Sequence, residues 1–283
     1  LTGAAHAILG GVPDGEAHPY VGLVDVGDTI CTGFAISPTV IVTAAHCFDA
    51  DDDTRATVTF AEDASDPDVI VEYPGTWTVS PNYAGLGADD LAVVVLDAPV
   101  TLPRLAQLPA EGAADDLPKK AMLTLVGYGL QDDGSAYTRE TTTVRVSTPD
   151  APKKTGTLKL HDGKTGFCFG DSGGPDLQGD VALGVNSALS NKKCKGPGFS
   201  ARLDTPSALA FAVPATLTMP YAAGRVAASV GASELRVALQ TSAAAPVRLL
   251  EPLFAGGGAL GVEVAQLGTF WVVAPDVVDA DQL

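Results

Sequence analysis

The sequence has few basic residues, and this shortage excludes whole classes of partner. Only 17 lysines and arginines stand against 34 acidic residues among 283, so the formal net charge is −17. Nucleic acids and anionic membrane surfaces attract basic patches, and we therefore expect neither as a partner. We expect the excess of acidic groups to keep the protein soluble outside the cell.

Long hydrophobic runs are also absent. One of the longest, LAVVVL at 91–96, is far shorter than the roughly 20 apolar residues that a membrane-spanning helix needs. We therefore expect no membrane insertion. Apolar residues nevertheless make up 46% of the chain, enough for the core of one large or two ordinary domains.

Cysteine is scarce, and no two of the four cysteines form the C-x-x-C pair that is typical of zinc sites and redox motifs. Two disulfides are the natural interpretation, although four cysteines allow three pairings and free thiols remain an alternative. Disulfides form in oxidising compartments, so we expect a secreted, extracellular protein. We expect no metal and no other cofactor, since the acidic stretch DADDD at 49–53 lacks EF-hand spacing and fits a solvated loop.

No segment keeps a helical apolar period beyond two or three turns, whereas 31 glycines and 20 prolines separate short runs rich in valine, threonine and isoleucine. This pattern predicts an all-β chain whose strand spacing suits barrels or a sandwich. The predicted strands are TVIVTA (39–44), ATVTF (56–60), LAVVVL (91–96), AMLTLVGY (121–128), TTTVRVS (141–147), GTLKL (156–160) and VALGVNSA (181–188).

Two changes of composition divide the chain. The polar stretch rich in proline and alanine at 101–120 resembles a linker between two halves, and RLDTPSALAFA (202–212) suits one short helix. Beyond it, cysteine and histidine disappear. We predict an appended β-rich module at 213–283, with strands at 234–240 and 261–266 and a turn at the GGG of 256–258, and the sequence does not reveal its role.

The stretch FCFGDSGGP (167–175) surrounds Ser172 with glycines, which suits either a reactive loop or a tight turn. A serine hydroxyl becomes a nucleophile only beside a base, usually an imidazole held by a carboxylate. All four histidines, at positions 6, 18, 46 and 161, precede Ser172. This order excludes the G-x-S-x-G elbow of α/β-hydrolases, whose histidine follows the serine.

Three blocks of sequence follow one another along the chain: CTGFAIS with TAAHC, then DDLAVVVLD, then GDSGGP. Together they resemble the signatures of the chymotrypsin-like (trypsin-family) serine proteases, over about residues 8–212. The resemblance implies two antiparallel six-stranded β-barrels, at about 8–105 and 118–204, with the catalytic site in the cleft between them. The C-terminal β module at 213–283 lies outside the resemblance.

The resemblance also implies roles for individual residues. His46 would be the general base, Asp90 the carboxylate that orients it, and Ser172 the nucleophile. The neighbouring Asp89 is the weaker candidate, because the family pattern of aspartate, aliphatic residue and alanine begins at Asp90. The backbone N–H groups of Gly170 and Ser172 would form the oxyanion hole.

Two disulfides are implied as well, Cys31 with Cys47 and Cys168 with Cys194. The resemblance further defines a pocket for the side chain before the cleaved bond, lined by Gly166, Phe167, Ala188, Leu189 and Gly198. Gly166 stands at its floor, where a preference for lysine or arginine would need an aspartate. We expect a shallow pocket for small or medium apolar residues.

The segment ILGG (8–11) resembles the mature amino terminus of the family, where the α-amino group of Ile8 would pair with Asp171. Residues 1–7, LTGAAHA, would be an N-terminal extension or propeptide remnant, and the chain would remain a zymogen until the Ala7–Ile8 bond is cut. Cleavage by the enzyme itself, a signal-peptidase site at AHA, and an inert tail all remain open.

The sequence therefore predicts a monomeric serine endopeptidase that acts on proteins or peptides. The alternative is a binding protein on a protease scaffold that captures a partner without cleaving it.

Overall fold

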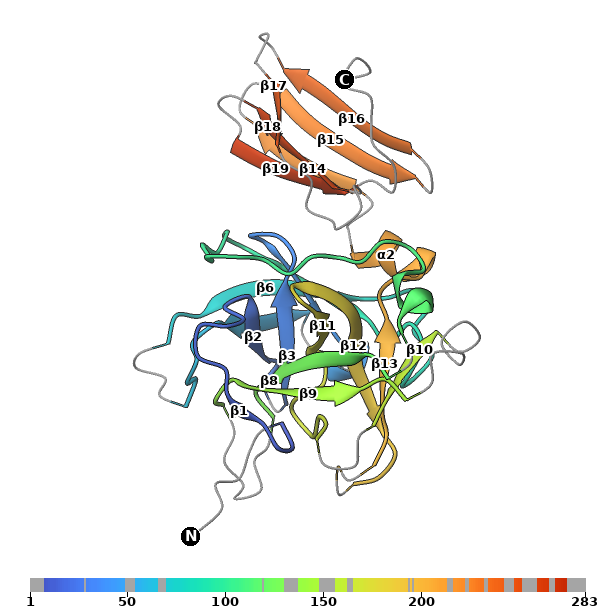
Figure 1. The fold of residues 1–283 in the computed structure, drawn as a ribbon. Coiled ribbons are helices and arrows are strands. Elements are labelled where there is room, and N and C mark those ends of the chain that lie inside the picture. The colour runs from blue at the N-terminus through green and yellow to red at the C-terminus, as the bar shows by residue number, and fades with distance from the viewer. Residues whose placement is uncertain are drawn as a thin grey trace.

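The computed structural model describes residues 8–212, except 28, 49–53, 66–69, 119, 130–136, 148–155, 162–164, 193 and 195, and beyond them the backbone of six strands. It confirms the predicted all-β class, with two antiparallel β-structures before the single α-helix of the described residues, α2 (Pro206–Ala212) (Figure 1). The features predicted at 1–7, 49–53 and 256–258 lie outside the described residues.

The first structure is a closed antiparallel barrel of six strands in the order β2-β3-β4-β7-β6-β5. Its β-branched residues suit a pleated, buried surface: all four residues of β4 are buried, whereas buried and exposed residues alternate along much of β6. The strands are β2 (Val21–Asp25), β3 (Ile30–Ala35), β4 (Val40–Thr43), β5 (Arg55–Thr59), β6 (Tyr73–Val79) and β7 (Ala92–Leu96).

The second structure is a seven-stranded sheet in the order β1-β9-β8-β11-β12-β13-β10. A bridge between Val146 and Leu160 joins the ends of β9 and β10, so the last six strands of this order form a ring. The strands are β1 (Val12–Pro13), β8 (Met122–Gly127), β9 (Glu140–Arg145), β10 (Thr157–Leu160), β11 (Pro175–Gln178), β12 (Val181–Leu189) and β13 (Gly198–Arg202).

Strand β1 does not belong to the first barrel, although we expected that barrel to begin near residue 8. It pairs with β9, and so lies on the sheet of the second half. Pro13 has no N–H to donate, which suits the edge of a sheet. The amino-terminal segment therefore adds an edge strand to the sheet of the second half.

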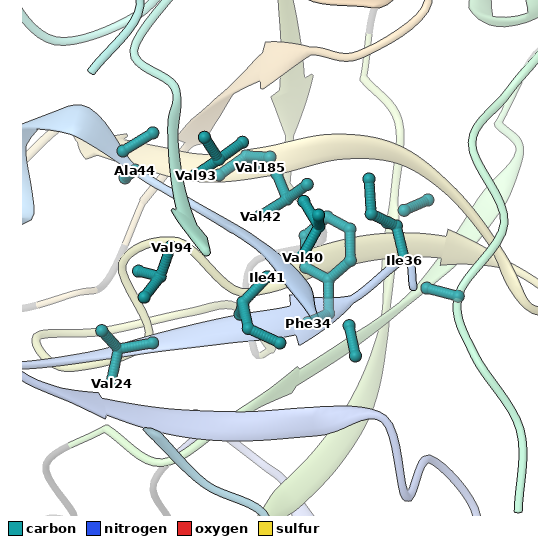
Figure 2. Close-up of a cluster of buried hydrophobic side chains, with 14 of the residues drawn as sticks. Val24, Phe34, Ile36, Val40, Ile41, Val42, Ala44, Val93, Val94 and Val185 are labelled. Atoms are coloured by element: carbon teal, nitrogen blue, oxygen red, sulfur yellow. The ribbon is translucent and has the colours of Figure 1, made fainter. Parts of the chain in front are cut away.

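The core of the first barrel continues into the second. A single cluster of buried side chains includes Val42 of β4, Val93 of β7 and Val185 of β12 (Figure 2). Burying this shared apolar surface holds the two barrels against each other.

The predicted linker is bonded to both barrels. Ala106 N–H donates to the carbonyl of Ala35 in the first barrel (2.9 Å), and Gln107 O accepts from Ala182 N in the second (2.9 Å). Within it the short 3-10 helix η2 (Ala113–Asp116) is held by the carboxylate of Asp204, which accepts from Ala114 N at 2.7 Å. These contacts limit how far the barrels can move apart.

Beyond α2, six strands form two three-stranded antiparallel sheets with consecutive strand order. The predicted strands at 234–240 and 261–266 correspond to β16 (Glu234–Thr241) and β18 (Ala259–Val264). The others are β14 (Thr216–Tyr221), β15 (Gly224–Gly231), β17 (Val247–Leu250) and β19 (Gly268–Val273). Among the helices of the described residues, none is long and apolar enough to cross a membrane.

A fully buried carboxyl in the second barrel makes stability depend on pH. Burial raises the pKa of Asp176 on β11 to about 7, although the nearby Ser200 hydroxyl acts to lower it. The folded state therefore holds a proton that the unfolded chain releases near pH 4. The contribution of Asp176 to the free energy of unfolding should fall as the pH rises from about 4 to about 7, and then level off.

Asp176→Asn should remove this loss. We expect the variant to gain on the wild type by a few kcal/mol between pH 4.5 and pH 8, measured by urea unfolding at each pH. Glu16→Gln, which changes an exposed carboxylate, is the control and should leave the pH dependence as it was. A constant difference between Asp176→Asn and the wild type across this range would contradict the prediction.

Candidate active site

His46 lies in a short 3-10 helix, η1 (Ala45–Cys47), that follows β4. The Cys31–Cys47 disulfide links this turn to β3. The backbone N–H of His46 donates to Asp90 Oδ1 at 2.9 Å. The side chain keeps 22% of its surface exposed. The imidazole is thus fixed at its backbone and partly open to solvent.

The carboxylate of Asp90 is completely buried behind this ring. His46 Nδ1 donates to Asp90 Oδ2 at 2.7 Å, and the hydroxyl of Ser187 donates to the same oxygen at 2.5 Å. A carboxylate can only accept here, so it holds the ring proton on Nδ1 and leaves Nε2 as an acceptor.

Ser172 completes the chain of contacts. Its Oγ lies 2.8 Å from His46 Nε2, within hydrogen-bond reach. With the proton on Nδ1, Ser172 donates its hydroxyl proton to Nε2. The structure therefore brings together the three side chains that the sequence analysis selected, in the geometry that activates a serine nucleophile.

The loop around Ser172 depends on its glycines. Gly170 has a φ of 92°, which favours glycine, and a Cβ on Gly173 would lie 2.1 Å from Thr43 Oγ1. Among the described residues, no hydrogen bond uses the N–H of Gly170 or Ser172, although the N–H groups of Asp171, Gly173 and Gly174 all donate within the protein. The two amides predicted for the oxyanion hole remain available to a ligand.

Asp171 lies inside the protein directly before Ser172. Its carboxyl accepts from Gly129 N at 2.9 Å and from Cys168 N at 2.8 Å. Burial raises its pKa to about 8; these two hydrogen bonds act to lower it, and the charge of Glu140 raises it further. Among the described residues, no cation acts on this pKa.

The predicted pocket residues lie together. Leu189 on β12 pairs with Gly198 on β13, and a Cβ on Gly198 would lie 2.5 Å from the ring of Phe167. Phe167 is buried, whereas a Cβ on Gly166 would face open space. Ala188 is half-buried beside Leu189. The phenylalanine ring therefore occupies space that the glycine on β13 leaves vacant.

The implied disulfides are both present, and all four cysteines take part in them. Cys168–Cys194 links the loop before Ser172 to the turn between β12 and β13. As a crosslink it contributes roughly 2–4 kcal/mol.

Comparison with known proteins agrees with this geometry. The family model described as Trypsin matches residues 8–209. The chain belongs to the trypsin family. It is 30% identical over 196 residues to a brachyurin of Leptuca pugilator, covering 64% of this chain and 85% of that protein. It is 28% identical over 201 residues to a trypsin of Saccharopolyspora erythraea, covering 65% of this chain and 86% of that protein.

A solved structure shares the trypsin-family fold. A mutant of human heparin-binding protein superposes with a TM-score of 0.59 at 21% identity, over 72% of this chain and 92% of its own. At this identity the likeness establishes the two-barrel fold alone.

The sequence analysis missed two residues of the site. Ser187, which donates to Asp90, lies in the predicted strand 181–188, and Thr32, beside the Ser172 loop, lies in the block CTGFAIS. Nothing in their spacing distinguishes them from other strand hydroxyls. The carboxylate bonded to His46 is that of Asp90, whereas the carboxylate of Asp89 accepts from Ser207 of α2 at 3.0 Å.

Proposed function

We propose that the protein is a secreted serine endopeptidase that cleaves peptide bonds through an acyl-enzyme. Residues 8–212 would be the protease domain, 1–7 an extension and 213–283 a separate module. The observation that carries the proposal is the chain of hydrogen bonds from Asp90 through His46 to Ser172, at 2.7 and 2.8 Å. Two disulfides in the described residues support secretion.

The proposed reaction has two stages. Ser172 Oγ attacks the peptide carbonyl while His46 Nε2 takes its proton, and Asp90 stabilises the resulting imidazolium. The N–H groups of Gly170 and Ser172 stabilise the oxyanion. His46 then protonates the amine, the amine departs, and the acyl group remains on Ser172 as the acyl-enzyme. In the second stage His46 takes a proton from water, the hydroxide attacks the ester, and the acid leaves as Ser172 regains its proton.

The alternative is capture of a partner without cleavage. The solved structure compared above is a mutant of human heparin-binding protein, and heparin is a polyanion. A net charge of −17 opposes binding of that class of ligand. The assembled nucleophile and base favour catalysis over capture.

A fluorophosphonate probe separates the two hypotheses, because it labels only a serine that a base activates. We expect the protein, with Ile8 as its amino terminus, to be labelled at Ser172, and Ser172→Ala to remain unlabelled. Ser207→Ala, which changes a serine outside the site, should be labelled as the wild type is. Failure of the wild type to react, while trypsin reacts in the same solution, would overturn the proposed activity.

Specificity for small or medium apolar residues follows from Phe167, whose ring fills the space over Gly198. We expect peptide esters of alanine and valine to be turned over faster than those of leucine, phenylalanine or arginine. Phe167→Ser should raise kcat/KM for the leucine and phenylalanine esters by about 10- to 100-fold, as space for several carbon atoms opens.

Phe169→Ser is the matched control, since it removes a phenylalanine of the same loop that is 48% exposed. It should leave the order of preference unchanged. A wild-type enzyme that prefers arginine esters, or a Phe167→Ser variant with the wild-type preference, would contradict the proposed pocket.

Activation would follow release of Ile8. Its side chain is buried, and its neighbour Leu9 pairs with Gly166 of the pocket. A freed α-amino group would supply the cation that the buried carboxyl of Asp171 lacks among the described residues, and would lower its raised pKa.

We expect the chain that begins at Leu1 to show a lag before activity appears. Amino-terminal sequencing after incubation should then find Ile8 in the wild type and Leu1 in Ser172→Ala, because Ala7 is a small residue of the proposed specificity. Identical termini in both proteins would exclude self-cleavage. Full activity with Leu1 intact would exclude the zymogen.

A further inference from the structure

Thr32 lies on β3, fully buried where the first barrel meets the Ser172 loop. Its backbone N–H donates to the carbonyl of Ser172 at 2.8 Å. Its side-chain hydroxyl donates to the carbonyl of Gly170 at 2.9 Å. One residue of the first barrel therefore holds the carbonyls of both residues whose N–H groups form the proposed oxyanion hole.

The hydroxyl of Thr32 has a second partner that fixes its direction. Tyr128 N, just beyond the end of β8, donates to Thr32 Oγ1 at 3.1 Å. With a donor on one side and an acceptor on the other, the hydroxyl proton points at Gly170. The backbone is fixed too, because the hydroxyl of Thr43 donates to Thr32 O at 2.8 Å.

The bond to Gly170 matters because glycine rotates freely. Gly170 has a φ of 92°, and without a side chain it has several other backbone conformations open to it. An oxyanion hole works only if its donors already point at the place where negative charge develops. The bond holds the peptide unit between Gly170 and Asp171, and so restricts rotation about ψ of Gly170, the residue whose N–H is the proposed oxyanion donor.

We propose that Thr32 is a positioning residue, whose hydroxyl holds Gly170 in the conformation that completes the oxyanion hole. The inference rests on the proposed function. It deepens that function, because it assigns to a side chain of the first barrel a share in stabilising the transition state on a loop of the second half. Thr32 touches neither substrate nor reacting atoms, and acts through Gly170.

The test compares Thr32→Val, which keeps the shape and removes the hydroxyl, with Thr32→Ser, which restores the hydroxyl. Thr59→Val is the matched control, since Thr59 is a buried threonine on β5 whose hydroxyl accepts from a backbone amide, Ala61 N, at 3.4 Å. The enzyme with Ile8 at its amino terminus is assayed for kcat and KM on an alanine ester. Inhibition by a peptide aldehyde, which becomes tetrahedral on Ser172, and the thermal midpoint are measured alongside.

For Thr32→Val we expect kcat to fall about 10- to 100-fold, less than the 10²–10³-fold loss on removing an oxyanion donor outright. KM should stay within about two-fold, because the lost interaction acts mainly in the transition state. Binding of the aldehyde should weaken by the same factor as kcat. Thr32→Ser should recover most of kcat, and Thr59→Val should keep all of it.

Three results would overturn the inference while leaving the proposed function intact: an unchanged kcat in Thr32→Val, a Thr32→Ser variant as slow as Thr32→Val, or an equal loss of kcat in Thr59→Val at an equal thermal midpoint. A wild type that neither reacts with the fluorophosphonate nor hydrolyses the ester overturns both proposals. If Thr32→Val does not fold, Thr32→Ser and Thr32→Ala are compared at a temperature below both thermal midpoints, and equal kcat values there would also refute the inference.

Discussion

Replacing Ser172 by alanine is expected to lower kcat by about 10⁶-fold, since enzymes that share the serine–histidine–aspartate arrangement lose about this much without their nucleophile. His46→Ala should cost a similar factor, because Ser172 then loses the base that lies 2.8 Å from its hydroxyl and takes its proton. The double variant should be scarcely slower than either single one, as the two side chains act in one step. The measurement is kcat on an alanine ester with enzyme in large excess over any contaminating protease.

Non-additivity is the sharper part of this result. If Ser172 and His46 worked in separate steps, their losses would multiply, and the double variant would be slower than either by many orders of magnitude. The residual rate should exceed that of the uncatalysed reaction by about 10³-fold, owing to the oxyanion donors and substrate binding. If Thr32→Val, added to Ser172→Ala, lowers this residual rate further, the result would link the two proposals.

Much of the fold follows from local sequence. The strands β4, β7, β8 and β12 are short runs of valine, leucine and threonine, and burial of such residues dominates their choice of structure. Pairing between distant segments is harder to foresee. The two-residue strand β1 carries no strand pattern of its own, and only its partner β9 defines it.

The site divides in the same way. His46, Asp90 and Ser172 stand in motifs that can be recognised in the chain, and the barrels bring them within hydrogen-bond distance. Residues such as Thr32 and Ser187 act through backbone or carboxylate oxygens more than 95 positions away in the sequence. A hydroxyl on a strand shows nothing of the group that it will meet, so only the folded chain reveals these contacts.

The carboxylate behind the imidazole gives the second large expected effect. Asp90→Asn should lower kcat/KM by about 10⁴-fold near neutral pH, although the side chain keeps its shape. The amide N–H of asparagine can donate a hydrogen bond to His46 Nδ1. Nδ1 then carries no proton, and the ring proton lies on Nε2 instead. A protonated Nε2 faces Ser172 at 2.8 Å in the wild-type geometry and cannot accept the hydroxyl proton.

Asp89→Asn is the matched control for this variant. Asp89 is the adjacent aspartate, has a φ of 57° that asparagine tolerates, and accepts from Ser207 of α2, away from the imidazole. Its variant should keep kcat/KM within about two-fold of the wild type, because the ring tautomer is untouched. Both variants are to be assayed on the same ester after their thermal midpoints have shown that they fold. Equal activities in the two would mean that Asp90 does not set the tautomer, and a large loss in Asp89→Asn alone would transfer the orienting role to its neighbour.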